Sequence, residues 1–249
     1  MRRPRIADLP PALQSPARFV RGIVKKPPYT FEGDVIATGH YSPFLDDEEF
    51  SSQYAMVAHT WPGWDIRWRL WILTRCAINC AALDGSFAEF GVYRGGCSFM
   101  VLSQCRPRPG RSYFLFDTFG GIPSAGLTAH EDETGFAGRW SDTTLDEVRS
   151  RLEPWRDQTR FVVGDVFETL RSEETGPVAF VHLDLNAAAP TELALRYAWS
   201  RMLQGGMIVF DDYGWAGYED QRRLIDKFFK DEAEGPIALP TGQALAVKL

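Results

Sequence analysis

The chain has 249 residues, of which 45% are hydrophobic and 24% charged, and its formal net charge is −6. These values are ordinary for a soluble globular protein with one large α/β domain, and the negative charge gives no reason to expect a nucleic-acid partner. There is no run of about 20 apolar residues, so we expect no segment that spans a membrane. The four cysteines lack metal-type spacing, which indicates reduced thiols in a cytoplasmic protein.

The chain divides by composition near residue 60. Residues 1–60 are rich in proline and glycine and weakly periodic, and we expect an N-terminal extension or cap there. Residues 61–249 are expected to form the main domain, which opens with a helix over residues 61–83. One apolar face of this helix carries Leu70, Leu73 and Ala77, and the other carries Trp64, Trp68 and Trp71. Two apolar faces indicate packing between the domain and something else: the N-terminal segment, a substrate or a second subunit.

A strand, a glycine turn and a helix are predicted between Gly85 and Ser98. The apolar run around Glu89 is typical of a buried parallel strand, and the glycines that follow allow a tight turn into a helix. This unit is the first half of a nucleotide-binding α/β fold, but its E-x-G-x-x-x-G-G spacing is that of neither dinucleotide binders nor phosphate loops. A carboxylate at Glu89 would repel a pyrophosphate and attract an ammonium group. S-adenosylmethionine carries such a group.

The next two predicted strands also end in carboxylates. Residues 112–117 form an apolar run that ends at Asp117, where an acid in such folds accepts hydrogen bonds from ribose hydroxyls. Residues 160–165 end at Asp165, which can meet an adenine amino group. The alternatives are a cap at Asp117 and a turn-forming role for Asp165.

A long connection, residues 118–144, lies between these two strands. It is rich in glycine and carries His130. A loop of this length in a compact domain is usually functional, so we expect a lid over a site.

Three more carboxylates are predicted at the same edge of the sheet. Residues 178–184 form a strand ending at Asp184, and residues 207–210 form another that ends at Asp211-Asp212. Between them we expect a helix that Thr191 caps and Gly205-Gly206 stop. Parallel sheets bind ligands beyond the carboxyl ends of their strands. Three clustered carboxylates favour Mg²⁺, unless one or two only cap the next helix. A helix over residues 217–230 and an antiparallel hairpin then close the chain.

Together these stretches resemble the macrocin O-methyltransferase family of class I S-adenosylmethionine-dependent enzymes. The pieces that carry the resemblance span roughly residues 85–215 in the right order. They are Glu89–Gly96 (EFGVYRGG), Phe116–Pro123 (FDTFGGIP), Gly164–Leu170 (GDVFETL), His182–Asp184 with Pro190-Thr191, and Gly205–Tyr213 (GGMIVFDDY). The resemblance implies a Rossmann-like fold with a seven-stranded, mostly parallel sheet, an antiparallel last strand and helices on both faces. It also implies Mg²⁺-assisted methylation of a sugar hydroxyl on a small natural product or its precursor.

The resemblance further implies roles for individual residues. The cofactor would contact the glycine turn and the ends of the next two strands, through Glu89, Gly91, Tyr93, Gly95, Asp117, Thr118, Asp165 and Val166. The metal would be held by Asp184, Asp211 and Asp212. Asp184 is a catalytic candidate through the metal that it would hold. Apart from the resemblance, His182 and His130 are candidates for the general base that takes the hydroxyl proton. The chain departs from the family at Asn186, where relatives often carry a second acid, and this weakens the metal assignment.

Other functions stay open at this point. One is a metal-free methyltransferase acting on nitrogen, carbon or an acidic hydroxyl, which Asn186 suggests. Another is a non-catalytic relative that binds the cofactor or only a partner protein, and a Rossmann oxidoreductase is the most distant. The sequence identifies neither the acceptor nor the oligomeric state, and a homo-oligomer is one of the possible states.

Overall fold

The computed structural model describes residues 31–33, 36–106 and 108–249. The first 30 residues of the expected N-terminal extension therefore lie outside the described residues. Within the described residues, no helix is both long and apolar enough to cross a membrane.

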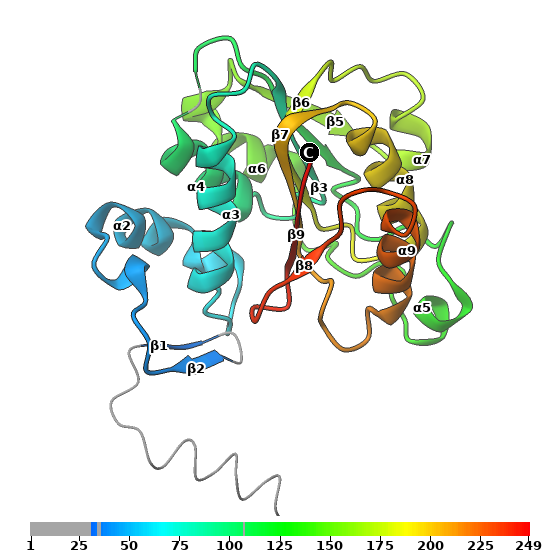
Figure 1. The fold of residues 1–249 in the computed structure, drawn as a ribbon, viewed down its shortest axis with the longest axis horizontal. Helices are drawn as coiled ribbons and strands as arrows, with labels where there is room; N and C mark the ends of the chain where they lie inside the picture. Colours follow the sequence, from blue (N-terminus) through cyan, green and yellow to red (C-terminus); the bar gives the residue numbers. More distant parts are fainter. Residues whose placement is uncertain (1–30, 34–35, 107) are drawn as a thin grey trace, which may run out of the picture.

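A seven-stranded sheet in the order β5-β4-β3-β6-β7-β9-β8 forms the centre of the molecule (Figure 1). Its strands are β3 (Ser86–Phe90), β4 (Tyr113–Asp117), β5 (Thr159–Val163), β6 (Val178–Leu183), β7 (Met202–Phe210), β8 (Ile237–Ala238) and β9 (Ala244–Val247). Strands β3 to β7 run parallel, whereas β9 pairs antiparallel with β7 and with β8. The predicted α/β fold and its closing antiparallel hairpin are confirmed.

Helices cover both faces of this sheet (Figure 1). One hydrophobic cluster joins the first face to helices α3 (Arg67–Asn79), α4 (Gly96–Cys105) and α6 (Leu145–Arg151). A second cluster joins the other face to α8 (Ala188–Trp199) and α9 (Glu219–Phe229), and α7 (Val166–Thr169) follows β5. Successive residues of the central strands alternate between the clusters: Phe87 lies in the first and Ala88 in the second. Both faces are buried, and this explains why the strands read as continuous apolar runs.

The described part of the N-terminal segment contains the β1 (Phe31–Gly33) and β2 (Ile36–Thr38) hairpin and helix α2 (Glu48–Val57). Phe44 and Phe50 of this segment pack on α3. Trp68 of α3 lies edge-on to Phe44 at a centroid distance of 5.1 Å, and Trp71 meets Phe50 at 5.3 Å. The N-terminal segment is therefore the partner of Trp68 and Trp71. Trp64 precedes the helix, which begins at Arg67 and not at residue 61, and its ring meets Trp215 instead.

Two sequence expectations around α8 are wrong. The helix begins at Ala188, so Thr191 lies inside it, where its hydroxyl accepts a hydrogen bond from Gln221 Nε2 at 2.8 Å instead of capping the helix. The helix also ends at Trp199, and Gly205 and Gly206 lie within β7. Strand pairing ends the helix early, because the Val178 amide of β6 already donates to the carbonyl of Arg201 at 2.9 Å.

Candidate active site

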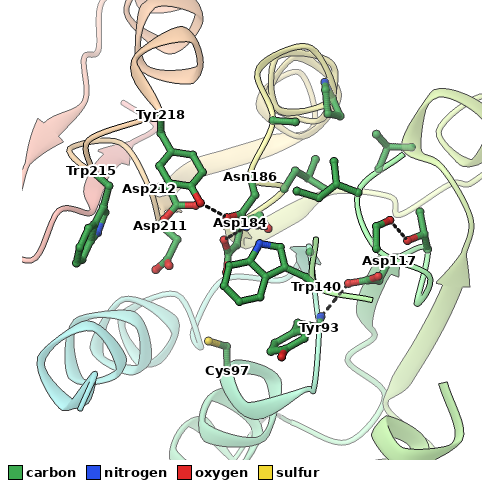
Figure 2. Close-up of a pocket in the computed structure, with 18 of the residues that line it drawn as sticks. Tyr93, Cys97, Asp117, Trp140, Asp184, Asn186, Asp211, Asp212, Trp215 and Tyr218 are labelled. Atoms are coloured by element: carbon green, nitrogen blue, oxygen red, sulfur yellow. Dashed lines mark hydrogen bonds between the residues drawn. The ribbon is translucent and has the colours of Figure 1, made fainter. Parts of the chain in front are cut away.

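A cavity of about 560 Å³ opens at the carboxyl edge of the sheet (Figure 2). Its walls come from the ends of β3 to β7, from the start of α3 and from the 118–144 connection. The residues we predicted from the sequence that line it are Gly91, Tyr93, Asp117, Thr118, Asp165, Val166, Asp184, Asp211 and Asp212. Five parallel strands thus bring most of the predicted site to one place.

The glycine turn after β3 forms one end of this cavity. Gly91 has φ +88° and its Cα faces the carbonyl of Asp184 too closely to admit a side chain, and Gly95 has φ +71° with Val148 Cγ1 only 2.7 Å from where a Cβ would lie. Asp117 Oδ2 accepts hydrogen bonds from the backbone amides of Val92 at 2.7 Å and Tyr93 at 2.8 Å. The acid at the end of β4 therefore fixes the shape of the turn.

Further along this wall, two predicted residues have local roles. Asp165 caps α7, with its Oδ1 accepting from the Phe167 amide at 2.9 Å, and it also lines the cavity. Thr118 donates its hydroxyl to the carbonyl of Gly121 at 2.8 Å. Each side chain combines a structural role with exposure to the cavity.

The 118–144 connection is ordered around a short helix, α5 (Ala129–Glu133), that we did not predict. Thr128 and Glu131 form a capping box at its start. Glu131 is 2% exposed, and its Oε1 accepts a hydrogen bond from the Ala188 amide at the first turn of α8, at 2.7 Å. This carboxylate anchors the connection to the sheet domain.

At the other end of the cavity the three predicted metal ligands converge. Asp211 and Asp212 are buried, and Asp184 lies beside them at the end of the neighbouring strand β6 (Figure 2). Burial and the nearby Asp212 raise the pKa of Asp184 well above its ordinary range, and burial also raises the pKa of Asp212. Among the described residues Asp212 Oδ2 has no hydrogen-bond partner. A buried, unpartnered carboxylate oxygen in such a cluster is suited to a cation.

Residues that we did not single out as ligands surround this cluster. Arg69 of α3 forms an ion pair with Asp211 and lies 3.8 Å from Asp212 Oδ1. No pattern in the sequence indicated this arginine, because its partners lie far along the chain and only the fold joins them. Its guanidinium also stacks 5.5 Å from the ring centre of Trp215.

Asn186 completes the rim of the cluster. It has φ +58°, a left-handed conformation that asparagine tolerates, and its Nδ2 donates to Asp184 Oδ1 at 2.8 Å. Tyr218 donates its hydroxyl to Asn186 Oδ1 at 2.9 Å. Burial, with Asp212 and Asp184, raises the pKa of Tyr218, so that its hydroxyl stays protonated and donates. The departure from an acid at this position therefore provides a donor that orients Asp184.

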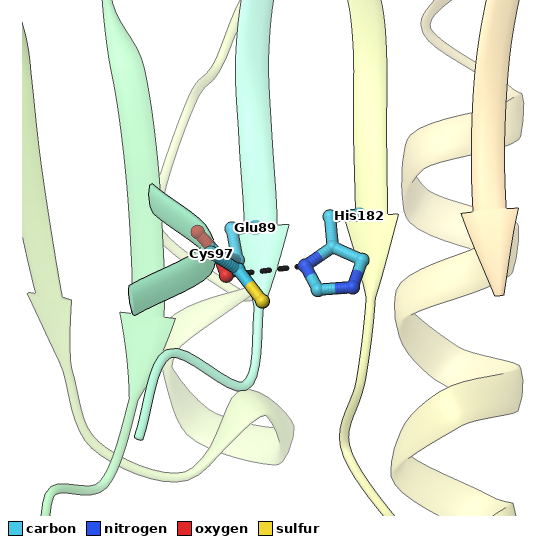
Figure 3. Close-up of side chains that lie close together, drawn as sticks. All are labelled: Glu89, Cys97 and His182. Carbon is cyan, nitrogen blue, oxygen red and sulfur yellow. Dashed lines mark hydrogen bonds and ion pairs between the residues drawn. The ribbon is translucent and has the colours of Figure 1, made fainter. Parts of the chain in front are cut away.

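Glu89 and His182 do not line the cavity. They lie side by side on the neighbouring strands β3 and β6 (Figure 3). Glu89 is 1% exposed, and it accepts hydrogen bonds from the hydroxyls of Ser98 and, at 3.0 Å, Tyr113. His182 is fully buried, with its Nδ1 3.1 Å from Glu89 Oε1 and its Nε2 3.6 Å from Asp211 Oδ1. The pair thus connects the first turn of α4 to the carboxylate cluster.

Cys97 completes the group in Figure 3, with its thiol close to both Glu89 and His182. Burial, followed by Glu89 and Asp184, raises the pKa of this thiol well above its usual value. Metals bind the thiolate rather than the thiol, so this trio is poorly suited to a soft metal.

Two further predicted residues are outside the cavity. Gly95 lies at the N-cap of α4 and shapes the turn without lining the cavity. His130 is exposed on α5, where its neighbours are Glu219 and Asp220 at the start of α9. The fold does not bring this histidine to the carboxylates.

Comparison with known proteins decides the family. The family model for macrocin O-methyltransferases (TylF) matches residues 46–237. The chain belongs to the macrocin O-methyltransferase family. It is therefore an S-adenosylmethionine-dependent O-methyltransferase.

Curated relatives of this family member act on different molecules. The chain is 29% identical over 186 residues to the 8-demethyl-8-(2,3-dimethoxy-alpha-L-rhamnosyl)-tetracenomycin-C 4'-O-methyltransferase of Streptomyces olivaceus, covering 69% of each chain. It is 28% identical over 208 residues to the mycinamicin III 3''-O-methyltransferase of Micromonospora griseorubida, covering 75% of this chain and 80% of the relative.

Among solved structures, the O-methyltransferase NovP is similar to this macrocin O-methyltransferase family member. It has a TM-score of 0.65 at 21% identity, over 72% of this chain and 79% of NovP. At this identity the likeness shows the shared fold.

Proposed function

We propose that this enzyme methylates a sugar hydroxyl of a glycosylated natural product, with the assistance of Mg²⁺. The observation that carries the proposal is that the glycine turn and the carboxylate cluster open into one cavity. A methyl donor bound at the glycine turn and an acceptor hydroxyl bound at the carboxylate cluster would then lie side by side.

The cofactor is proposed to lie against the glycine turn. Asp117 has about four lone-pair positions, as a carboxylate does, and the amides of Val92, Tyr93 and Phe119 occupy three of them. One position is left to accept a ribose hydroxyl. Thr118, Asp165 and Val166 line the adjoining wall, where we place the adenosine. Glu89 would act on this site indirectly, through the helix α4 that its bond to Ser98 holds.

The carboxylate cluster fits a divalent cation. Its donors are hard oxygens, Asp211 and Asp212 are buried, and Asp212 Oδ2 has no partner among the described residues. We propose that Asp184, Asp211 and Asp212 hold Mg²⁺. When bound, the cation supplies Lewis acidity that lowers the pKa of an acceptor hydroxyl.

The transfer itself needs an aligned acceptor and a place for one proton. The acceptor oxygen attacks the methyl carbon, the bond from carbon to sulfur breaks, and S-adenosylhomocysteine leaves. We assign the hydroxyl proton to Asp184, because this carboxylate lines the cavity at the cluster where the acceptor hydroxyl is proposed to lie. His182 and His130, the other candidates, do not line the cavity. Asn186 orients Asp184 through the bond from its Nδ2.

The walls of the cavity favour a neutral acceptor with apolar surface. Arg69 is the one cationic side chain among the described residues that line it, and Arg69 is paired with Asp211. The two phosphates of a nucleotide-activated sugar would face carboxylates there. Exposed indoles of Trp64 and Trp140 also line the cavity, and such rings stack on sugars and on flat apolar groups. We therefore propose a glycoside rather than a sugar nucleotide as the acceptor.

We place the enzyme in the cytoplasm, because its four cysteines are free thiols. The 118–144 connection is proposed to act as a lid, since it contributes Ile122, Pro123 and Trp140 to the cavity wall.

A metal-free reaction is the second candidate. The ion pair between Arg69 and Asp211 favours it, because an arginine already supplies positive charge to the cluster. Full activity in excess EDTA would support this candidate and contradict Mg²⁺ assistance.

Turnover of a panel of glycosides with S-adenosylmethionine and Mg²⁺ tests the proposed function. Mass spectrometry would detect the methylated product, and NMR would locate the methyl group. We expect an O-methylated sugar. Methylation of the aglycone alone, or of sugar nucleotides alone, would contradict the proposal.

A further inference from the structure

Arg69 reaches the carboxylate cluster from helix α3, whereas the carboxylates follow the ends of strands β6 and β7. It pairs with Asp211, lies 3.8 Å from Asp212 Oδ1, and stacks on Trp215 at 5.5 Å. The side chain is only 15% exposed. A permanent positive charge is therefore held at the oxygens that we propose as cation ligands.

Each oxygen of Asp211 already has a partner in this arrangement. Oδ2 accepts from Arg69, and Oδ1 accepts from Gln243 Nε2 at 2.9 Å. A cation that binds Asp211 must therefore share an oxygen with one of these partners or replace it. The amide of Gln243 is neutral, whereas the guanidinium of Arg69 repels a cation placed on the same carboxylates. Arg69 is thus the partner that gives way.

We propose that Arg69 and a divalent cation are alternative partners of Asp211 and Asp212. Arg69 neutralises the cluster while the cation is absent, and the cost of releasing it sets the affinity and the exchange of the cation. The inference rests on the proposed function, because it takes these carboxylates as the cation site, and it adds a role for an arginine that the methyl transfer does not use.

Calorimetric titration of Mg²⁺ into the cofactor-free protein tests the competition. We compare wild type with Arg69→Met and Arg69→Gln, two variants that remove the charge and differ in polarity. Both are expected to bind Mg²⁺ at least tenfold more tightly than wild type. Arg67→Met is the matched control, since Arg67 lies on the same helix and pairs with Asp65 instead. Its affinity for Mg²⁺ should equal that of wild type, and binding of S-adenosylhomocysteine verifies that each variant is folded.

A second measurement uses the fluorescence of Trp215, the indole on which Arg69 stacks. Mg²⁺ is expected to change the tryptophan fluorescence of wild type, and Trp215→Phe should abolish that change. If Mg²⁺ binds while the signal of Trp215 stays constant, Arg69 keeps its contact and the proposal is overturned.

The outcomes separate this inference from the proposed function. Equal or weaker Mg²⁺ binding in both Arg69 variants overturns the competition, and so does an absence of binding in every protein. Binding by the variants but not by wild type supports the competition and contradicts Mg²⁺ assistance of the natural reaction. Tighter binding by the variants than by a wild type that also binds supports both.

Discussion

Asp117 shows how one side chain serves the backbone and, in our proposal, the ligand. Its carboxylate holds the glycine turn through three backbone amides and has one lone-pair position left. The sequence predicted a choice between a cap and a ribose ligand. The observed geometry is compatible with both at once.

Replacing Asp117 by alanine should weaken binding of S-adenosylhomocysteine by about 1.5–3 kcal/mol, the value of a charge-assisted hydrogen bond, or by more if the turn rearranges. Calorimetry measures this loss. Asp146→Ala, an exposed acid at the start of α6, is the control and should bind normally. An unchanged affinity in Asp117→Ala would remove Asp117 from the cofactor site.

Asp184→Asn should abolish methyl transfer and leave cofactor binding nearly intact. The amide keeps an oxygen that can accept the bond from Asn186, but it can neither take a proton nor hold a cation well. We expect a loss of turnover of about 100-fold or more, as for removal of a general base. Steady-state turnover and calorimetry with S-adenosylhomocysteine measure the two effects. Substantial activity in this variant would refute the assigned role.

Among the elements, the parallel strands could be predicted from the sequence, whereas the start of β7 and the side chain of α3 that faces the strand ends could not. The parallel strands could be located because each contains a short apolar run, and because all five end in a carboxylate or a glycine turn at the same edge. The start of β7 was missed because Met202 and Leu203 continue the helical period of α8. The position of Arg69 had no local signal, since helix periodicity says nothing about which distant strand end faces a side chain.

Glu131 ties the 118–144 connection to α8, so its loss should loosen the connection. Glu131→Ala removes buried hydrogen bonds to the amides of Thr128 and Ala188, and we expect about 1–3 kcal/mol of destabilisation. Hydrogen exchange should rise across residues 118–144. Glu133→Ala, on the same helix and exposed, is the control. Identical exchange in the two variants would show that Glu131 is no anchor.

The lid proposal makes its own prediction for the same segment. Cofactor and acceptor together should slow hydrogen exchange within residues 118–144, because Ile122, Pro123 and Trp140 line the cavity they would fill. Exchange measured with and without both ligands tests this. Equal protection in the two states would count against a lid.

At the scale of the whole molecule, the carboxylate cluster links stability to pH. Burial raises the pKa values of Asp184 and Asp212, so the folded protein binds more protons than the unfolded chain above about pH 4. The free energy of unfolding of the metal-free protein should therefore fall as pH rises from about 4 through the raised pKa values. Thermal unfolding in EDTA at a series of pH values measures this slope.

Asp212→Asn should flatten that slope, because it removes one of the two titrating groups. It should also stabilise the metal-free protein at neutral pH, because it removes a buried carboxylate that burial makes costly to ionise. A stability that rises with pH in wild type, or a destabilised variant, would contradict the assignment of this cluster.

The aromatic wall of the cavity and its two ends are built from different parts of the chain. The carboxylates and the glycine turn follow strands of the central sheet, whereas Trp61, Pro62 and Trp64 come from the turn before α3, and Trp215 from the turn before α9. Among these positions, Trp61 packs on the core and Trp215 contacts Arg69, whereas Trp64 is exposed. A combinatorial library confined to positions 62 and 64 would therefore vary the wall while keeping the carboxylates, the glycine turn and Arg69, which makes this scaffold a practical starting point for directed evolution toward new glycosides.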